Sequence, residues 1–143
     1  MLESGAMRAL TINGRRILDR IKLEHMAHGG LENGRLKVTW LDFEKYGVSP
    51  RLIDRSISEA VAVGLLVIEQ PGRRIHGKDM GSSAQYRLTY LPVSDAGSFC
   101  PPTNEWKRFG SNIKAAKSAI KASERKSGNG KSKCKFQPWP MPP

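Results

Sequence analysis

Basic side chains are the residues of this sequence best suited to chemistry, and they form two clusters. The first lies in PRLIDRSISEAVAV, where Arg51 and Arg55 are four residues apart. The second lies in the glycine-bounded segment PGRRIHGKDMG and consists of Arg73, Arg74, His76 and Lys78. Guanidinium groups form paired hydrogen bonds with guanine and charge-assisted bonds with phosphate. Both clusters therefore indicate contact with a polyanion.

Patterns for catalysis or metal binding are missing from the sequence. It contains no G-x-S-x-G motif and no phosphate-binding glycine loop followed by Lys and Ser or Thr. His25 and His28 stand in the order E-H-x-x-H, which differs from the zinc motif H-E-x-x-H, and no third ligand is indicated. The cysteines, Cys100 and Cys134, are too few for a disulfide scaffold or a four-cysteine zinc site. We therefore expect no enzymatic activity, no metal and no cofactor.

The overall charge favours the same kind of partner. The 143 residues include 24 Lys and Arg against 13 Asp and Glu, which gives a formal net charge of +11. Such a balance favours binding to nucleic acid. No apolar run approaches the roughly 18 residues of a membrane span, and the first ten residues lack the apolar core of a secretion signal. We expect a cytoplasmic, nucleoid-associated protein with no membrane partner.

The elements that must position the basic clusters follow from the periodicity of the chain. Apolar residues recur at helical spacing over 13–26, and a glycine pair then ends this first helix. RLKVTW predicts a short strand. Thr39 and Asp42 have the spacing of a capping box, so a second helix is expected to follow and to stop at Gly47. Three apolar residues are expected to pack it into the core: Leu41, Phe43 and Tyr46.

A third helix is predicted to begin at Ser49 and Pro50 and to end at Gly64. Ser49 would accept hydrogen bonds from the first turn, and the missing N–H of Pro50 costs nothing there. One face of this helix carries the apolar residues Ile53, Ile57, Ala60 and Val61. The opposite face, expected to be exposed, carries Arg51, Asp54, Arg55, Ser58 and Glu59.

Two strands, LLVIEQ and QYRLTYLP, are predicted to form a hairpin that Pro92 ends. Alternation places Tyr86, Leu88 and Tyr90 on one face, which we expect to be core. The second basic cluster then lies in the long loop at the hairpin tip.

Residues 93–143 are expected to form a Pro- and Lys-rich linker and a basic, largely disordered tail. The segment just after Pro92 is loop-like, residues 105–126 are partly helical, and disorder is expected after about residue 127. Three lysines of the Ala-rich stretch are candidates for non-specific DNA contacts: Lys114, Lys117 and Lys121. A Lys-rich solubilising tail is the alternative.

This order of elements resembles the winged helix-turn-helix domain, an α+β fold of three helices and a β-hairpin wing, over residues 8–92. The resemblance depends on LDFEKYGVSPRLIDRSISEAVAVG, hinged at Tyr46-Gly47-Val48, and on AVAVGLLVIEQPGRR followed by QYRLTYLP. It looks like the winged-helix proteins of bacterial chromosomes, plasmids and phages, including regulators and replication-associated factors. In that family the helix after the turn lies in the DNA major groove, and the wing contacts the backbone or minor groove.

The resemblance also implies the residues of the site. The recognition helix would present Ser49, Arg51, Arg55, Ser58 and Glu59, and the wing would present Arg73, Arg74, His76 and Lys78. The predicted function is sequence-specific binding of double-stranded DNA, as a transcriptional regulator or an accessory factor of a mobile element. The alternative is a non-catalytic protein-interaction adaptor that its basic tail tethers to nucleic acid. A protein partner or a homodimer is compatible with both, whereas RNA binding is disfavoured because no exposed aromatic platform is indicated.

Overall fold

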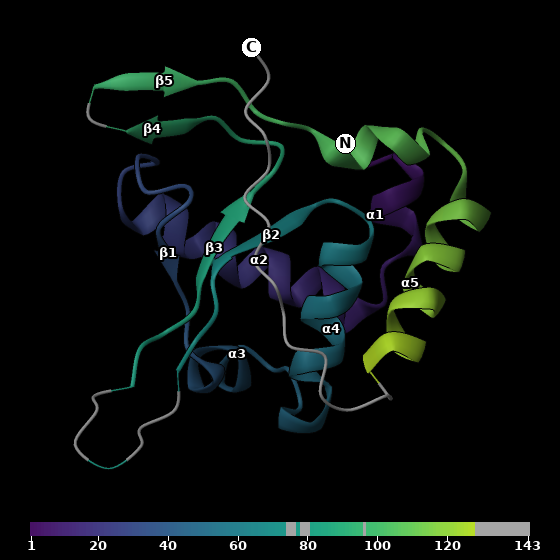
Figure 1. Ribbon diagram of the computed structural model, residues 1–143, viewed down its shortest axis with the longest axis horizontal. Coiled ribbons are helices and arrows are strands. Elements are labelled where there is room, and N and C mark those ends of the chain that lie inside the picture. Colours follow the sequence, from purple (N-terminus) through teal and green to yellow (C-terminus); the bar gives the residue numbers. More distant parts are fainter. Residues whose placement is uncertain (74–76, 78–80, 96, 128–143) are drawn as a thin grey trace.

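The computed structural model describes residues 1–73, 77, 81–95 and 97–127, which form an α+β arrangement of helices around a small antiparallel sheet (Figure 1). The elements run in the order α1 (Gly5–Ala9), α2 (Ile12–Ala27), β1 (Leu36–Lys37), α3 (Trp40–Lys45), α4 (Pro50–Ala62), β2 (Leu66–Gln70), β3 (Gln85–Leu88), β4 (Val93–Asp95), β5 (Ser98–Cys100), η1 (Glu105–Phe109) and α5 (Ile113–Ser127).

The first predicted helix is confirmed as α2. Thr11 caps its N-terminus, since the Thr11 side chain accepts a hydrogen bond from the N–H of Gly14 at 3.3 Å. The helix ends at Ala27 with His28 as its C-cap, and Gly29 and Gly30 follow with positive φ angles of 69° and 73°. The apolar stripe is buried at Ile17, Leu18 and Ile21.

The second predicted helix is confirmed as α3, including its capping box. The Thr39 hydroxyl accepts from the Asp42 N–H, and the Asp42 carboxylate accepts from the Thr39 N–H at 2.9 Å. Phe43 is fully buried, but the expectation that Leu41 and Tyr46 are buried is wrong. A helix of six residues turns only one narrow face toward α2 and α4, and Phe43 occupies it.

A tight turn joins α3 to α4. Gly47 has a φ of 102°, which favours glycine, and Val48 behind it is buried. Arg16 of α2 donates a hydrogen bond from Nη1 to the Gly47 carbonyl at 3.0 Å. The Arg16 side chain of α2 therefore stabilises the turn between α3 and α4.

The third predicted helix is confirmed as α4, with Pro50 at its first position. Ser49 is the N-cap residue, but its side chain makes no capping hydrogen bond in this structure. Ile53, Ile57 and Ala60 are buried as expected, whereas Val61 is exposed, so its assignment to the core is wrong.

The sheet has the order β1-β3-β2, and all of its neighbouring strands are antiparallel. β2 and β3 form the predicted hairpin, and β1 adds a third strand that is shorter than RLKVTW. Tyr86 is paired with both Leu36 and Ile68, and its ring meets Phe43 of α3 edge-on at 6.1 Å. The sheet therefore closes over the helices and completes the core.

The prediction that the segment after Pro92 is loop-like is wrong. Val93–Asp95 and Ser98–Cys100 form a second antiparallel hairpin, and Glu105–Phe109 is a 3-10 helix. The helical tendency of the Ala/Lys-rich stretch is confirmed as α5, which packs on α1 and α4 (Figure 1). Ala116 and Ile120 belong to the same buried cluster as the α2 and α4 residues. The expected disorder after about residue 127 lies outside the described residues.

Asn33 ties the loop after α2 to the end of β3. Its amide nitrogen lies 2.9 Å from the Leu88 carbonyl and within 3.2 Å of the Leu91 and Pro92 carbonyls. Its amide oxygen accepts from the Leu88 N–H at 2.8 Å. This buried side chain therefore replaces backbone pairing where the strand ends.

Candidate nucleic-acid interface

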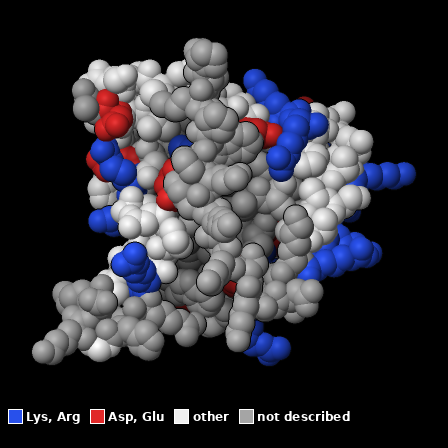
Figure 2. Space-filling view, in the orientation of Figure 1, with Lys and Arg blue, Asp and Glu red and all other residues white. Residues whose placement is uncertain are grey.

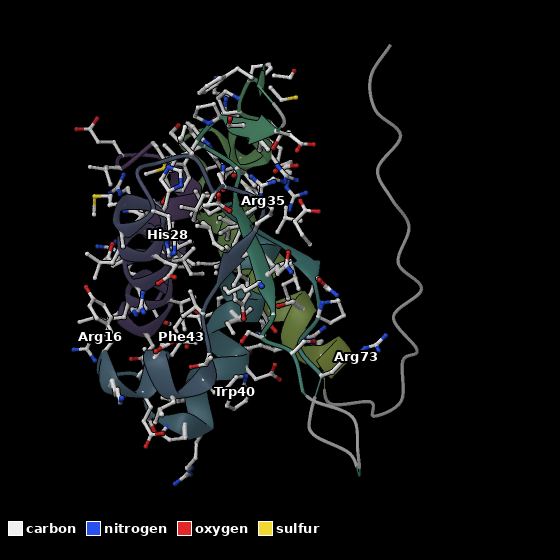
Figure 3. All side chains as sticks on the ribbon, turned by 90° about the vertical axis from the view of Figure 1, so that its left-hand side faces the viewer. Arg16, His28, Arg35, Trp40, Phe43 and Arg73 are labelled. Atoms are coloured by element: carbon white, nitrogen blue, oxygen red, sulfur yellow. The ribbon has the colours of Figure 1, made fainter. Side chains whose placement is uncertain are left out.

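α3, the N-terminal end of α4 and the β2–β3 hairpin lie at one end of the molecule (Figure 1). In Figure 3, Trp40 of α3 and Arg73 of the hairpin both lie in the lower part of the molecule, below Arg35 and His28. Arg73, the described member of the second basic cluster, is therefore at the same end of the fold as the start of α4, which carries Arg51.

Arg51 occupies the first turn of α4 and is exposed, as is the cap residue Ser49. Within the described part of the chain, Arg51 forms no ion pair, so its guanidinium is free to bind a ligand. Asp54 is also exposed on this helix, whereas Ser58, one turn further on, is partly buried. The first turn of α4 therefore presents exposed polar and charged side chains.

Arg55 is exposed but already held by carboxylates. Its Nη2 lies 2.6 Å from Oε1 of Glu124 on α5, and its Nε lies 3.9 Å from Oε1 of Glu59. A contact with a base would require Arg55 to leave Glu124. Arg55 is therefore ion-paired whereas Arg51 is not, although their spacing predicts the same role for both.

Glu59 does not lie on the exposed face of α4, and that expectation is wrong. Its side chain is 3% exposed, and its Oε2 accepts from the Thr11 hydroxyl at 2.7 Å and from the Thr11 N–H at 3.3 Å. A Cβ added to Gly14 would lie 3.0 Å from this oxygen, so glycine permits the close approach. The carboxylate sits at the N-terminus of α2, where the helix dipole favours a negative charge. Glu59 therefore joins α4 to α2.

The β2–β3 hairpin continues past its regular strands as far as Arg73. The N–H and C=O groups of Arg73 form two hydrogen bonds with Ser82, at 2.9 and 3.1 Å. The Arg73 side chain is exposed (Figure 3). This pairing fixes the position of the Arg73 backbone beyond the end of β2. The other three wing candidates, Arg74, His76 and Lys78, lie outside the described residues.

Three tail candidates, Lys114, Lys117 and Lys121, lie on α5 and are exposed. Figure 2 shows Lys and Arg side chains along the edge of the molecule where α5 lies in Figure 1. They are therefore carried by a packed helix instead of a linker.

Two ionisable groups near this end have shifted pKa values. The Thr39 backbone hydrogen bond, followed by the Thr39 hydroxyl, lowers the pKa of Asp42 below its ordinary value, which strengthens the start of α3. Burial, with the charge of Asp54 as a smaller cause, raises the pKa of Tyr86 to about 12. Tyr86 is therefore an uncharged core residue at neutral pH.

Sequence reasoning missed the apolar surface of α3. Trp40 and Leu41 are 51% and 56% exposed, although both are of a type usually found in a core. The capping box could have predicted this exposure, because it places Trp40 and Leu41 in the first turn of a helix that is only six residues long.

His25 and His28, at the C-terminal end of α2, have different surroundings. His28 Nδ1 lies 2.9 Å from the Glu24 carbonyl oxygen, while His25 Nδ1 is buried without a hydrogen-bond partner. Burial lowers the pKa of His25. Among the residues that the structure describes, no three His, Cys, Asp or Glu side chains come together to hold a metal ion.

None of the described helices combines the length and apolar character needed to cross a membrane. Comparison with protein-family models, with curated proteins and with solved structures found no match to this chain.

Proposed function

We propose that this chain is a sequence-specific binder of double-stranded DNA with a winged-helix arrangement. The observation that carries the proposal is the order α3, tight turn at Gly47, α4, and then the β2–β3 hairpin paired with β1. A helix after such a turn fits the major groove, and a hairpin beside it reaches the adjacent backbone. The protein would act as a transcriptional regulator or as an accessory factor of a mobile element. It would be located in the cytoplasm, associated with the nucleoid.

Arg51 is the best candidate for reading a base. It is exposed in the first turn of α4, which is the part of a recognition helix that meets base edges. Its guanidinium can donate two hydrogen bonds to O6 and N7 of guanine, worth roughly 1–3 kcal/mol of discrimination. Ser49 lies next to it and can donate to a phosphate or a base. Arg55 contributes only after it leaves Glu124, and Glu59 supports the helix from inside.

Arg73 is the described hairpin residue suited to phosphate. The paired backbone of Arg73 and Ser82 holds its exposed side chain at the hairpin, at the same end of the molecule as α4 (Figure 3). A guanidinium there supplies affinity and register without reading sequence. Arg74, His76 and Lys78 belong to the same proposed wing contact. Lys114, Lys117 and Lys121 are proposed to bind DNA without sequence preference, separately from the contact through α4 and the hairpin.

The experiment that tests this proposal is selection of bound sequences from a random duplex pool. A specific binder enriches a short motif and binds it more tightly than random duplex at the same salt concentration. Recovery of sequences with no preference above the electrostatic background would reject sequence-specific binding.

A non-catalytic adaptor is the second candidate, and the exposed Trp40 and Leu41 favour it. Exposed aromatic and apolar side chains that lie together are typical of protein interfaces. Changing both residues to Ser separates the two functions, because an adaptor would lose its partner while a DNA binder would keep its selected site.

A further inference from the structure

The outer side of α5 carries a row of cations that the proposed contact through α4 and the hairpin does not include. We define the α5 stripe as its four exposed basic residues: Lys114, Lys117, Lys121 and Arg125. At 100° per residue they fall within an arc of about 80°, and the eleven steps between the first and last cover about 16 Å. Lys and Arg side chains line the corresponding edge of the molecule in Figure 2.

Carboxylates do not neutralise the α5 stripe within the described part of the chain. Glu124 is the acidic residue of α5, and its Oε1 lies 2.6 Å from Arg55 on α4. Neighbours along the stripe are three or four residues apart, a spacing at which like charges repel each other and oppose the helix. A row of anions along α5 would remove this repulsion.

The α5 stripe is built on a docked helix. Ala116 and Ile120 are buried on its opposite side, against α1 and α4. The side chain of Asn112 caps its start by accepting from the N–H of Ala115 at 3.1 Å. The cations therefore have fixed positions along the helix, which a disordered tail would not give.

The direction of α5 decides which ligand can use the whole stripe. Arg108, just before α5, donates to the Ala62 carbonyl at the C-terminal end of α4 at 2.6 Å, and Glu124, near the end of α5, meets Arg55. The two helices are therefore antiparallel (Figure 1). Lys114 and Lys117 lie toward the C-terminal end of α4, far from Arg51 at its N-terminus. Lys121 and Arg125 lie nearer that end, so it is the Lys114 and Lys117 half of the stripe that lies away from a duplex bound by Arg51 and the hairpin.

We infer that the α5 stripe binds the phosphate backbone of a second DNA duplex, so that one chain joins two duplexes. The inference rests on the proposed function for the first duplex. Duplex DNA carries one negative charge per about 1.7 Å of helix axis, so a row of cations about 16 Å long laid along the backbone meets several phosphates. The match between a regular row of anions and a regular row of cations supports DNA backbone as the ligand.

The test is a capture assay with the full chain. Wild-type protein is bound to an immobilised duplex that contains the selected site, and a labelled random duplex is added in solution. The informative variant is Lys114→Ala with Lys117→Ala, and the matched control is Arg8→Ala with Lys22→Ala, which removes two cations from α1 and α2. Alanine is a good helix former, so both variants are expected to fold.

The inference expects wild type and control to capture the labelled duplex, and the Lys114 and Lys117 variant to capture it much more weakly while its affinity for the immobilised site stays unchanged. The slope of log K against log salt for the captured duplex should fall by about 1.8, since each phosphate contact contributes about 0.9. Capture by the variant as strong as that by wild type would reject the inference, as would a wild-type protein that binds the selected site without capturing a second duplex. If wild type binds no duplex at all, the proposed function itself fails.

Discussion

Glu59 provides the sharpest test of how the elements are held together. Replacing it with Ala leaves two Thr11 donors without the carboxylate that accepts from them at 2.7 and 3.3 Å. Hydrogen bonds to a charged group contribute about 1.5–3 kcal/mol each. Taking the lower figure for both bonds, we expect Glu59→Ala to reduce the free energy of unfolding by about 3 kcal/mol. For a domain of this size that lowers Tm by about 10 °C.

Urea unfolding of Glu59→Ala, Thr11→Val and the double variant measures this coupling directly. The pair should show an interaction energy of about 1 kcal/mol or more, because both substitutions remove the same contact. Glu44→Ala is the matched control, since Glu44 is exposed on α3 and its removal should change stability by less than about 0.5 kcal/mol. If Glu59→Ala is as stable as the control, Glu59 is not the link between α4 and α2.

Three further predictions concern stability. Asn33→Ala should cost about 2–4 kcal/mol in urea unfolding, because it leaves the Leu88 N–H and several carbonyls unpaired, whereas Asn13→Ala should not. Tyr86 has a pKa of about 12 in the folded protein and about 10 in the unfolded chain, so its contribution to the free energy of unfolding is complete below pH 10 and is lost as the pH rises through 12. Tyr86→Phe should therefore lose less stability than wild type between pH 9 and 12. Equal losses in the two proteins would refute this. Ala116→Glu would bury a charge between α5 and the core, so it should detach α5 and increase trypsin cleavage within this helix. Ala122→Glu, at an exposed position of the same helix, should leave cleavage unchanged.

The helices that form the candidate site could be predicted because their signals are local. The capping box of Thr39 and Asp42, the Ser-Pro start of α4 and the glycines that end each helix lie within a few residues of the elements they define. The basic character of the hairpin could be read in the same way. These signals fixed the order of elements from α2 to β3.

The features that could not be predicted depend on residues far apart in the chain. Glu59 looks like a surface charge until Thr11, 48 residues earlier, is placed against it. Asn33 looks like a turn residue until the fold brings Leu88, 55 residues later, beside it. The segment after Pro92 has weak periodicity because β4 and β5 are only three residues each, and α5 gains its burial from α1 and α4. No local pattern encodes these contacts.

The most direct measurement of the central claim compares the affinity of wild type and Arg51→Ala for a selected duplex and for random duplex at one salt concentration. A lost base contact should weaken the selected site by about 5- to 150-fold, which corresponds to roughly 1–3 kcal/mol, and random duplex much less. Arg73→Ala is the control, because a phosphate contact weakens both duplexes alike. Equal losses on both duplexes for Arg51→Ala would contradict the assignment of α4 as the helix that reads DNA.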